Sequence, residues 1–120
     1  MCEIKLTEIP KLQLRLREFA DQRDWKQFHS PKNLSMALIV EAGELAEHFQ
    51  WLTQDESFNL ANEKLEEVGE ELADIFVYLV RLADQLEIDL SEVVERKIGL
   101  NELKYPADKV RGSAKKYNEY

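Results

Sequence analysis

The sequence predicts an all-α protein, because apolar residues recur at helical spacing over long segments while turn-forming residues are scarce. The 120 residues include only 4 Gly and 3 Pro, too few for the many turns of a sandwich or barrel. Hydrophobic residues make up 44% of the chain and aromatic residues 9%, enough for the core of one domain. We expect a four-helix bundle over residues 1–106, followed by a polar tail over residues 107–120.

Two helices are predicted in the first half of the chain. The first covers residues 10–24, where apolar side chains are spaced three and four positions apart. The second covers residues 31–51. Its start is indicated by Ser30, an N-cap residue type, followed by Pro31 at the first helical position. A polar loop is expected after this helix.

Two further helices are predicted in the second half. The longest covers residues 62–86 and carries a broad apolar stripe. The last opens at Asp89, with Glu92 three residues later in a spacing that resembles a capping box. It is expected to end before Pro106, since proline cannot continue a helix.

Charge and cysteine content limit the classes of partner. The formal net charge of −8 disfavours nucleic-acid binding, which requires a basic surface. A single cysteine, Cys2, excludes an intrachain disulfide and is consistent with a reducing compartment. The longest strongly apolar run, residues 75–80, is too short to span a bilayer. We therefore expect a cytoplasmic protein with neither a nucleic-acid nor a membrane partner.

Two pairs of carboxylates carry the chemical signal. Glu41-Ala-Gly-Glu44 and Glu71-Leu-Ala-Asp74 each place two acids at positions i and i+3, which are neighbours on a helix surface. Both pairs adjoin apolar stripes, so packing of the two helices would bring four acids together at the edge of the core. Glycines accompany both pairs, Gly43 inside the first and Gly69 before the second. We interpret these glycines as allowing close approach of backbones, because glycine otherwise weakens a helix.

Such a cluster predicts a divalent cation, since four empty carboxylates would repel one another. Mg²⁺ prefers oxygen ligands and often combines one or two carboxylates with substrate phosphates. Four acids exceed the needs of one ion. They indicate either two or more ions, or three ligands with one acid left to orient an attacking water.

Three other interpretations explain the acidic pairs less well. Acidic pairs also occur on solvated helix faces, but two pairs on consecutive helices are less easily explained in this way. A di-iron bundle would need Glu-x-x-His on two helices, whereas Leu45 precedes His48 by three positions and Lys26 precedes His29 by three. A non-catalytic helical interaction module would explain the apolar stripes but not the acids beside them.

The acidic pattern resembles the MazG-like, all-α NTP pyrophosphatase superfamily, whose signature E-x-x-E is followed some two dozen residues later by E-x-x-D. Further motifs are similar to the short dCTP pyrophosphatase branch of this family. They are Arg23-Asp-Trp-Lys-Gln-Phe-His29, Glu47-His-Phe-Gln-Trp51, Lys104-Tyr-Pro106 and Arg111-Gly-Ser-Ala-Lys-Lys-Tyr117. The resemblance covers most of the chain.

The resemblance implies hydrolysis of a small dNTP, dCTP or a modified dCTP, to the monophosphate and pyrophosphate, in a house-cleaning or pool-balancing role. It implies dependence on Mg²⁺, for which Mn²⁺ could substitute, and a homodimer or a tetramer formed as a dimer of dimers. A monomeric bundle remains an alternative, as does a preference for dUTP or for NTPs in general.

The resemblance also assigns roles to individual residues. The expected metal ligands or water-orienting groups are Glu41, Glu44, Glu71 and Asp74. The expected contacts to the base and sugar are Trp25, His29, Trp51 and Tyr78. The expected phosphate contacts are Lys97, Asn101 and Lys104. For the tail residues Arg111, Ser113 and Lys116 two alternatives are open: they fold over the phosphates, or they are disordered.

Overall fold

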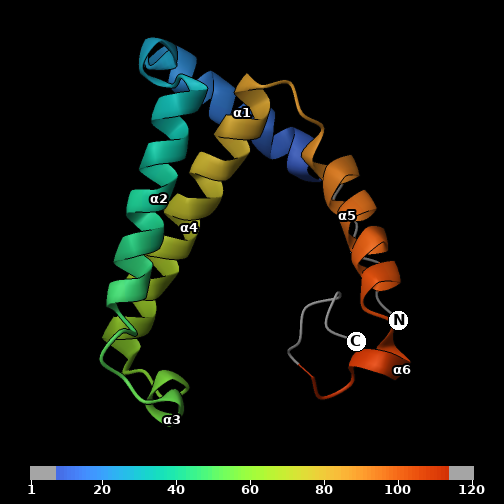
Figure 1. Ribbon diagram of the computed structural model, residues 1–120. Helices are drawn as coiled ribbons and strands as arrows, with labels where there is room; N and C mark the ends of the chain where they lie inside the picture. Colours follow the sequence, from blue (N-terminus) through green and yellow to red (C-terminus); the bar gives the residue numbers. More distant parts are fainter. Residues whose placement is uncertain (1–7, 114–120) are drawn as a thin grey trace. The chain divides into compact units, whose positions relative to one another are not determined.

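The computed structural model describes residues 8–113, and all regular secondary structure in this range is helical (Figure 1). The longer helices are α1 (Ile9–Gln22), α2 (Pro31–Glu47), α4 (Asn62–Gln85) and α5 (Leu90–Lys104). The short elements are the 3-10 helix η2 (Lys26–Phe28), α3 (Gln54–Ser57) and α6 (Ala107–Val110). The all-α prediction is confirmed.

Backbone contacts divide the chain into two compact units between Ile88 and Asp89. The first unit holds α1, η2, α2, α3 and α4, and the second holds α5 and α6. Packing of α5 into a common four-helix bundle stays a prediction, as does a separate tail from residue 107 onward.

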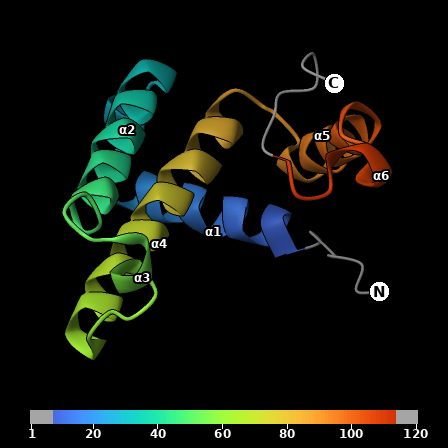
Figure 2. The same ribbon diagram turned by 60° about the horizontal axis from the view of Figure 1, so that its bottom comes forward.

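The first unit is built on a helical hairpin. Helices α2 and α4 lie side by side and run in opposite directions, with α3 in the connection between them, as two views show (Figures 1 and 2). Helix α1 packs against α4. The buried apolar residues come from all three helices and are Ala20, Leu34, Val68, Val80 and Ala83.

The predicted helix starts are confirmed at two positions where a side chain caps the backbone. The Ser30 hydroxyl oxygen accepts a hydrogen bond of 3.1 Å from the backbone N–H of Asn33. A carboxylate oxygen of Asp89 accepts one of 3.2 Å from the backbone N–H of Glu92. Each bond satisfies an N–H that has no partner within the helix.

The predicted end of the second helix is wrong, because α2 stops at Glu47 instead of residue 51. Beyond it the chain forms tighter turns, with backbone N–H groups of His48 and Phe49 bonded to carbonyls three residues back. The predicted loop also contains α3. A full capping box begins that helix: Thr53 accepts from the Glu56 N–H, and the Glu56 carboxylate accepts from the Thr53 N–H. These bonds lower the pKa of Glu56.

Large apolar side chains remain uncovered on the first unit. Met36, Ile39 and Val40 on α2 are 56–65% exposed. On α4, Leu65 and Leu72 are each 52% exposed. The apolar stripes that the sequence predicts are thus wider than the surfaces that α1, α2 and α4 cover. Within residues 8–113, no helix combines the length and apolarity needed to cross a membrane.

Candidate functional site

Three carboxylates meet where α2 and α4 pack together. Glu41 and Glu44 lie one turn apart on α2, and Glu71 faces them from α4. One oxygen from each lies within 4.8 Å of one from each of the others. We call Glu41, Glu44 and Glu71 the acidic triad. The hairpin therefore brings together most of the predicted cluster.

The close approach of the acidic triad changes the pKa of two of its carboxylates. A hydrogen bond shared with Glu71 is the largest cause that raises the pKa of Glu41, and burial raises it further. The pKa of Glu44 is raised chiefly by its hydrogen bond and charge repulsion with Glu41. Oε2 of Glu71 is buried without a hydrogen-bond partner, a costly arrangement for a carboxylate oxygen.

These residues fit a divalent cation. All the donors are carboxylate oxygens, the ligands that Mg²⁺ and Ca²⁺ prefer. Oxygens on opposite sides of one Mg²⁺ lie about 4.2 Å apart, so a spacing within 4.8 Å requires little movement. A cation would also give the buried Glu71 oxygen a partner. It would offset the close approach of the carboxylates, whose shared hydrogen bonds and charges raise the pKa of Glu41 and Glu44.

Asp74 borders the acidic triad but does not belong to it. It is exposed on α4, one turn beyond Glu71. Its charge nevertheless contributes to the raised pKa of Glu41. Asp74 also lines a neighbouring pocket, so it stands at the border between the acids and that pocket.

The neighbouring pocket lies between α1, α4 and the segment around η2, with a volume of about 520 Å³. We call it the aromatic pocket. The predicted site residues in its lining are Trp25, His29, Asp74 and Tyr78. The ring centroids of Trp25 and His29 are 6.1 Å apart, and Phe19 packs edge-on against Trp25 with centroids 5.6 Å apart. The structure thus gathers three predicted base-contacting residues in one pocket.

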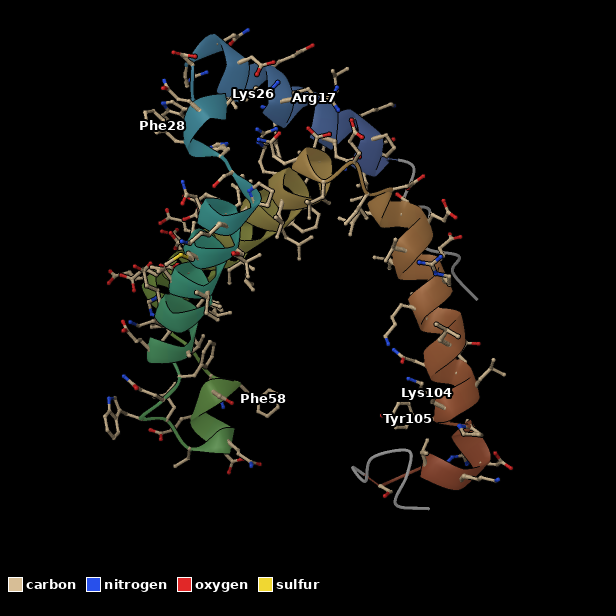
Figure 3. All side chains as sticks on the ribbon, turned by 45° about the horizontal axis from the view of Figure 1, so that its top comes forward. Arg17, Lys26, Phe28, Phe58, Lys104 and Tyr105 are labelled. Carbon is tan, nitrogen blue, oxygen red and sulfur yellow. The ribbon has the colours of Figure 1, made fainter. Side chains whose placement is uncertain are left out.

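A partly buried ionic network supports one wall of the aromatic pocket. Arg81 of α4 is only 3% exposed, and its Nη1 donates to Asp84 over 3.2 Å. Arg17, labelled in Figure 3, reaches from α1 to donate two hydrogen bonds of 3.0 and 2.6 Å to the same carboxylate. The hydrogen bond from Arg17 is the main reason that the pKa of Asp84 is lowered.

The network contacts His29 as well. Nε of Arg81 donates to Nδ1 of His29 over 3.4 Å. The pKa of His29 is lowered, first by burial and then by the Arg81 charge. The sequence predicted no role for Arg17 or Asp84. Arg81 has the same offset from Glu71 that Trp51 has from Glu41, which indicated a place near the base end of a ligand but not its contact with His29.

The structure does not bring Trp51 to the other aromatic residues. Trp51 lies in the turn that follows α2 and is 87% exposed. It does not line the aromatic pocket. Within one copy of the first unit, Trp51 is therefore not a wall of the aromatic pocket. Its contact with the base stays a prediction.

Lys97, Asn101 and Lys104 lie on α5, in the second compact unit. Their spacing of four and three residues places them on one face of the helix, and all are exposed. Lys104 is at the helix end, beside Tyr105 (Figure 3). Their contact with phosphates stays a prediction. Of the tail residues, Arg111 and Ser113 are exposed after α6, and Lys116 lies outside the described residues.

Comparison with known proteins places the sequence among nucleotide-cleaving relatives. The model of the MazG-like family matches residues 36–120. The chain is 46% identical over 104 residues to human dCTP pyrophosphatase 1 and 47% identical to the bovine protein. The match covers 85% of this chain but 61–62% of those relatives, so the chain spans about three fifths of their length.

A more distant viral relative and a solved structure agree with these matches. Gene 37 protein of Mycobacterium phage L5 is 33% identical over 82 residues, covering 67% of this chain and 70% of that protein. The crystal structure of a pyrophosphatase from Archaeoglobus fulgidus superposes with a TM-score of 0.77 at 41% identity. That match covers 88% of this chain and 99% of the archaeal chain.

Proposed function

Because the chain belongs to the MazG-like family, we propose that it hydrolyses a deoxynucleoside triphosphate to the monophosphate and pyrophosphate. The proposed substrate is dCTP or a modified dCTP, as the names of the vertebrate relatives suggest. The proposed cofactor is Mg²⁺, which Mn²⁺ could replace. The biological role would be removal of unwanted nucleotides or balancing of nucleotide pools.

The observation that carries the proposal is the acidic triad with its buried, unpartnered oxygen. Glu41, Glu44 and Glu71 would hold Mg²⁺. When bound, the cation would supply positive charge to neutralise the triphosphate and the charge that develops during cleavage. A structural role alone would not explain this close approach of carboxylates, whose shared hydrogen bonds and charges raise the pKa of Glu41 and Glu44.

Asp74 suits a different task from that of the triad. It lies outside the triad, yet close enough for its charge to affect the pKa of Glu41. We propose that its exposed carboxylate accepts a hydrogen bond from the attacking water and orients it toward the α-phosphorus. General-base assistance of this kind requires a carboxylate within hydrogen-bond reach of the water.

The aromatic pocket would receive the base and sugar. Trp25 offers a ring face for stacking, which contributes on the order of 1–3 kcal/mol per base but tolerates any base. Selectivity must then come from polar groups, for which His29 and Tyr78 are in place. Since Asp74 borders both the triad and the pocket, one nucleotide could extend from one to the other.

A homodimer or tetramer is proposed as the working form. The uncovered apolar residues of α2 and α4 would be buried by a second copy, since large exposed apolar patches are uncommon on monomers. The very exposed Trp51 would complete a base site only in such an assembly. Lys97, Asn101 and Lys104 are proposed to contact the phosphates.

The proposal is tested by incubating the protein with Mg²⁺ and one nucleotide at a time: each dNTP, dUTP, and dCTP modified on its base. Pyrophosphate and monophosphate are then quantified. We expect the highest kcat/KM for dCTP or its modified form, and no turnover with a chelator. Glu71→Gln should be inactive, whereas Glu66→Gln, an exposed acid on the same helix, should retain activity. A preference for dUTP would change the substrate assignment, and no pyrophosphate from any nucleotide would refute the function.

A further inference from the structure

The contact between Arg81 and His29 indicates which ring nitrogen of the histidine carries a proton. Nε of Arg81 donates to Nδ1 of His29 over 3.4 Å. A guanidinium group has only donors and does not lose its proton in proteins. Nδ1 must therefore be the acceptor. In a neutral imidazole with Nδ1 unprotonated, the single N–H is at Nε2.

We propose that Arg81 is a positioning residue that holds His29 in the Nε2–H tautomer, so that this histidine acts as a fixed hydrogen-bond donor toward the base. The inference rests on the proposed function, in which the base occupies the aromatic pocket. His29 and Arg81 both line that pocket. Among residues 8–113, no acceptor for Nε2 of His29 is present, and the side-chain hydrogen bond of His29 is made at Nδ1.

The partners of Arg81 are held in place by independent contacts. Asp84 accepts from Arg81 and is also bound by two hydrogen bonds from Arg17. The backbone carbonyl of His29 accepts a hydrogen bond of 2.7 Å from the side chain of Gln85. The histidine can therefore lose its contact with Arg81 without losing its backbone anchor. Burial and the Arg81 charge lower the pKa of His29, which favours the neutral ring.

A fixed donor discriminates between bases more sharply than an imidazole that can exchange its tautomers. Cytosine has acceptors at O2 and N3, whereas uracil carries an N–H at position 3. A donor aimed at this edge therefore favours cytosine, while a histidine free to present either tautomer could serve both bases. Loss of a paired polar contact is the change that most reduces discrimination.

The tautomer can be measured directly in the nucleotide-free protein by ¹⁵N NMR of the imidazole rings at neutral pH. We expect His29 to show an unprotonated Nδ1 and a protonated Nε2. His48 is the internal reference, because it lies outside the aromatic pocket, with Nζ of Lys64 3.2 Å and a Glu67 carboxylate oxygen 3.8 Å from its Nδ1. Arg81→Met should shift the His29 nitrogens toward averaged values and leave those of His48 unchanged. Lys64→Met should leave the His29 nitrogens unchanged. A protonated Nδ1 of His29 in the wild-type protein would overturn the proposal.

The effect on specificity is measured as kcat/KM for dCTP and dUTP. Arg81→Met should raise KM for dCTP about three- to tenfold, the range expected for one lost hydrogen bond, with a smaller change in kcat. The preference for dCTP over dUTP should narrow by a similar factor. In a His29→Ala background, Arg81→Met should have little further effect, because the two residues act as a unit. Equal effects of Arg81→Met in both backgrounds would overturn the proposed route through His29.

The NMR and kinetic measurements distinguish a failure of this inference from a failure of the proposed function. If the wild-type protein cleaves no nucleotide, the proposed function fails, and base reading by His29 fails with it. If it cleaves dCTP but the wild-type spectrum shows a protonated Nδ1, only the role of Arg81 fails. The spectrum of the wild-type protein decides the tautomer even if Arg81→Met does not fold.

Discussion

Glu41, Glu44 and Glu71 cannot all be ionised without mutual repulsion, because their oxygens lie within 4.8 Å of one another. Glu44→Gln removes one of these charges. We expect this variant to be inactive and, without metal, at least as stable as the wild type. Mg²⁺ should raise the melting temperature of the wild type by binding the folded state, and should raise that of the variant less. Calorimetry with and without Mg²⁺ measures both effects.

The difference in stability between Glu44→Gln and the metal-free wild type should depend on pH. A carboxyl group whose pKa is raised by folding destabilises the folded state once it ionises. For Glu41 and Glu44, this loss begins as the pH rises above the ordinary value of 4.5. It is complete above their raised pKa values. The stability advantage of Glu44→Gln over the metal-free wild type should therefore appear over this window and persist at higher pH. An advantage only at low pH would contradict the assignment.

The sequence predicted some of these residues and missed others for a definite reason. Glu41 and Glu44 are one helical turn apart, so helical spacing alone makes them neighbours. Arg81 and His29 are 52 positions apart. Their contact depends on how the segment around η2 folds against α4, which no local pattern encodes.

Within one chain, Gly43 and Gly69 do not serve the close approach of helix backbones that the sequence predicted, so that prediction is wrong. A Cβ built at Gly43 or Gly69 would meet no atom within 4 Å, so neither permits a close approach of α2 and α4. Gly43→Ala should instead stabilise the fold by about 1 kcal/mol, because alanine favours helix more than glycine. Gly69→Ala should behave similarly. Urea denaturation gives the free energy of unfolding for each variant.

A different result would locate an interface. If either alanine variant loses stability or activity while its helix content is unchanged, a backbone outside the described chain approaches that glycine. The explanation by helix propensity would then be contradicted.

Helix starts were more predictable than helix ends. Ser30 and Asp89 are short polar residues whose side chains bond to backbone N–H groups, so the cap is visible in the sequence. The end of α2 lacks such a signal, since Phe49 and Trp51 continue an apolar pattern beyond Glu47. The start of α3 was readable from the Thr53 to Glu56 spacing.

At the scale of the whole molecule, the exposed apolar face of α2 predicts self-association. Ile39 is 65% exposed. We expect analytical ultracentrifugation to give a dimer or tetramer for the wild type. Ile39→Asp should shift it toward the monomer, because burying an unpaired charge in an interface is unfavourable. Gln54→Asp, at an exposed polar position of α3, is the control. A monomeric wild type would rule out the assembly.

Trp51 provides a second test of the assembly. If a neighbouring copy places it against the base, Trp51→Ala should weaken binding of every nucleotide by similar factors, about tenfold for each 1.4 kcal/mol lost. Titration of inactive Glu71→Gln with a non-hydrolysable dCTP analogue and Mg²⁺, followed by tryptophan fluorescence, measures this affinity. Unchanged affinity in a folded Trp51→Ala variant would remove Trp51 from the base site.

The fold class was predictable because apolar periodicity and scarce turn residues are properties of the whole sequence. The association of three acids followed from packing two consecutive helices. The assembly and the relation of α5 to the acidic triad depend on contacts between units or copies. Helical periodicity shows that a face is apolar, but it does not show what covers it.

We predict that water attacks the α-phosphorus of a nucleoside triphosphate at the acidic triad. Hydrolysis of dCTP in ¹⁸O-water, with the products separated and analysed by mass spectrometry, shows which phosphorus is attacked. We predict one ¹⁸O atom in the monophosphate and none in the pyrophosphate. Label in the pyrophosphate would show attack at the β-phosphorus. Release of orthophosphate with a nucleoside diphosphate would contradict the claim altogether.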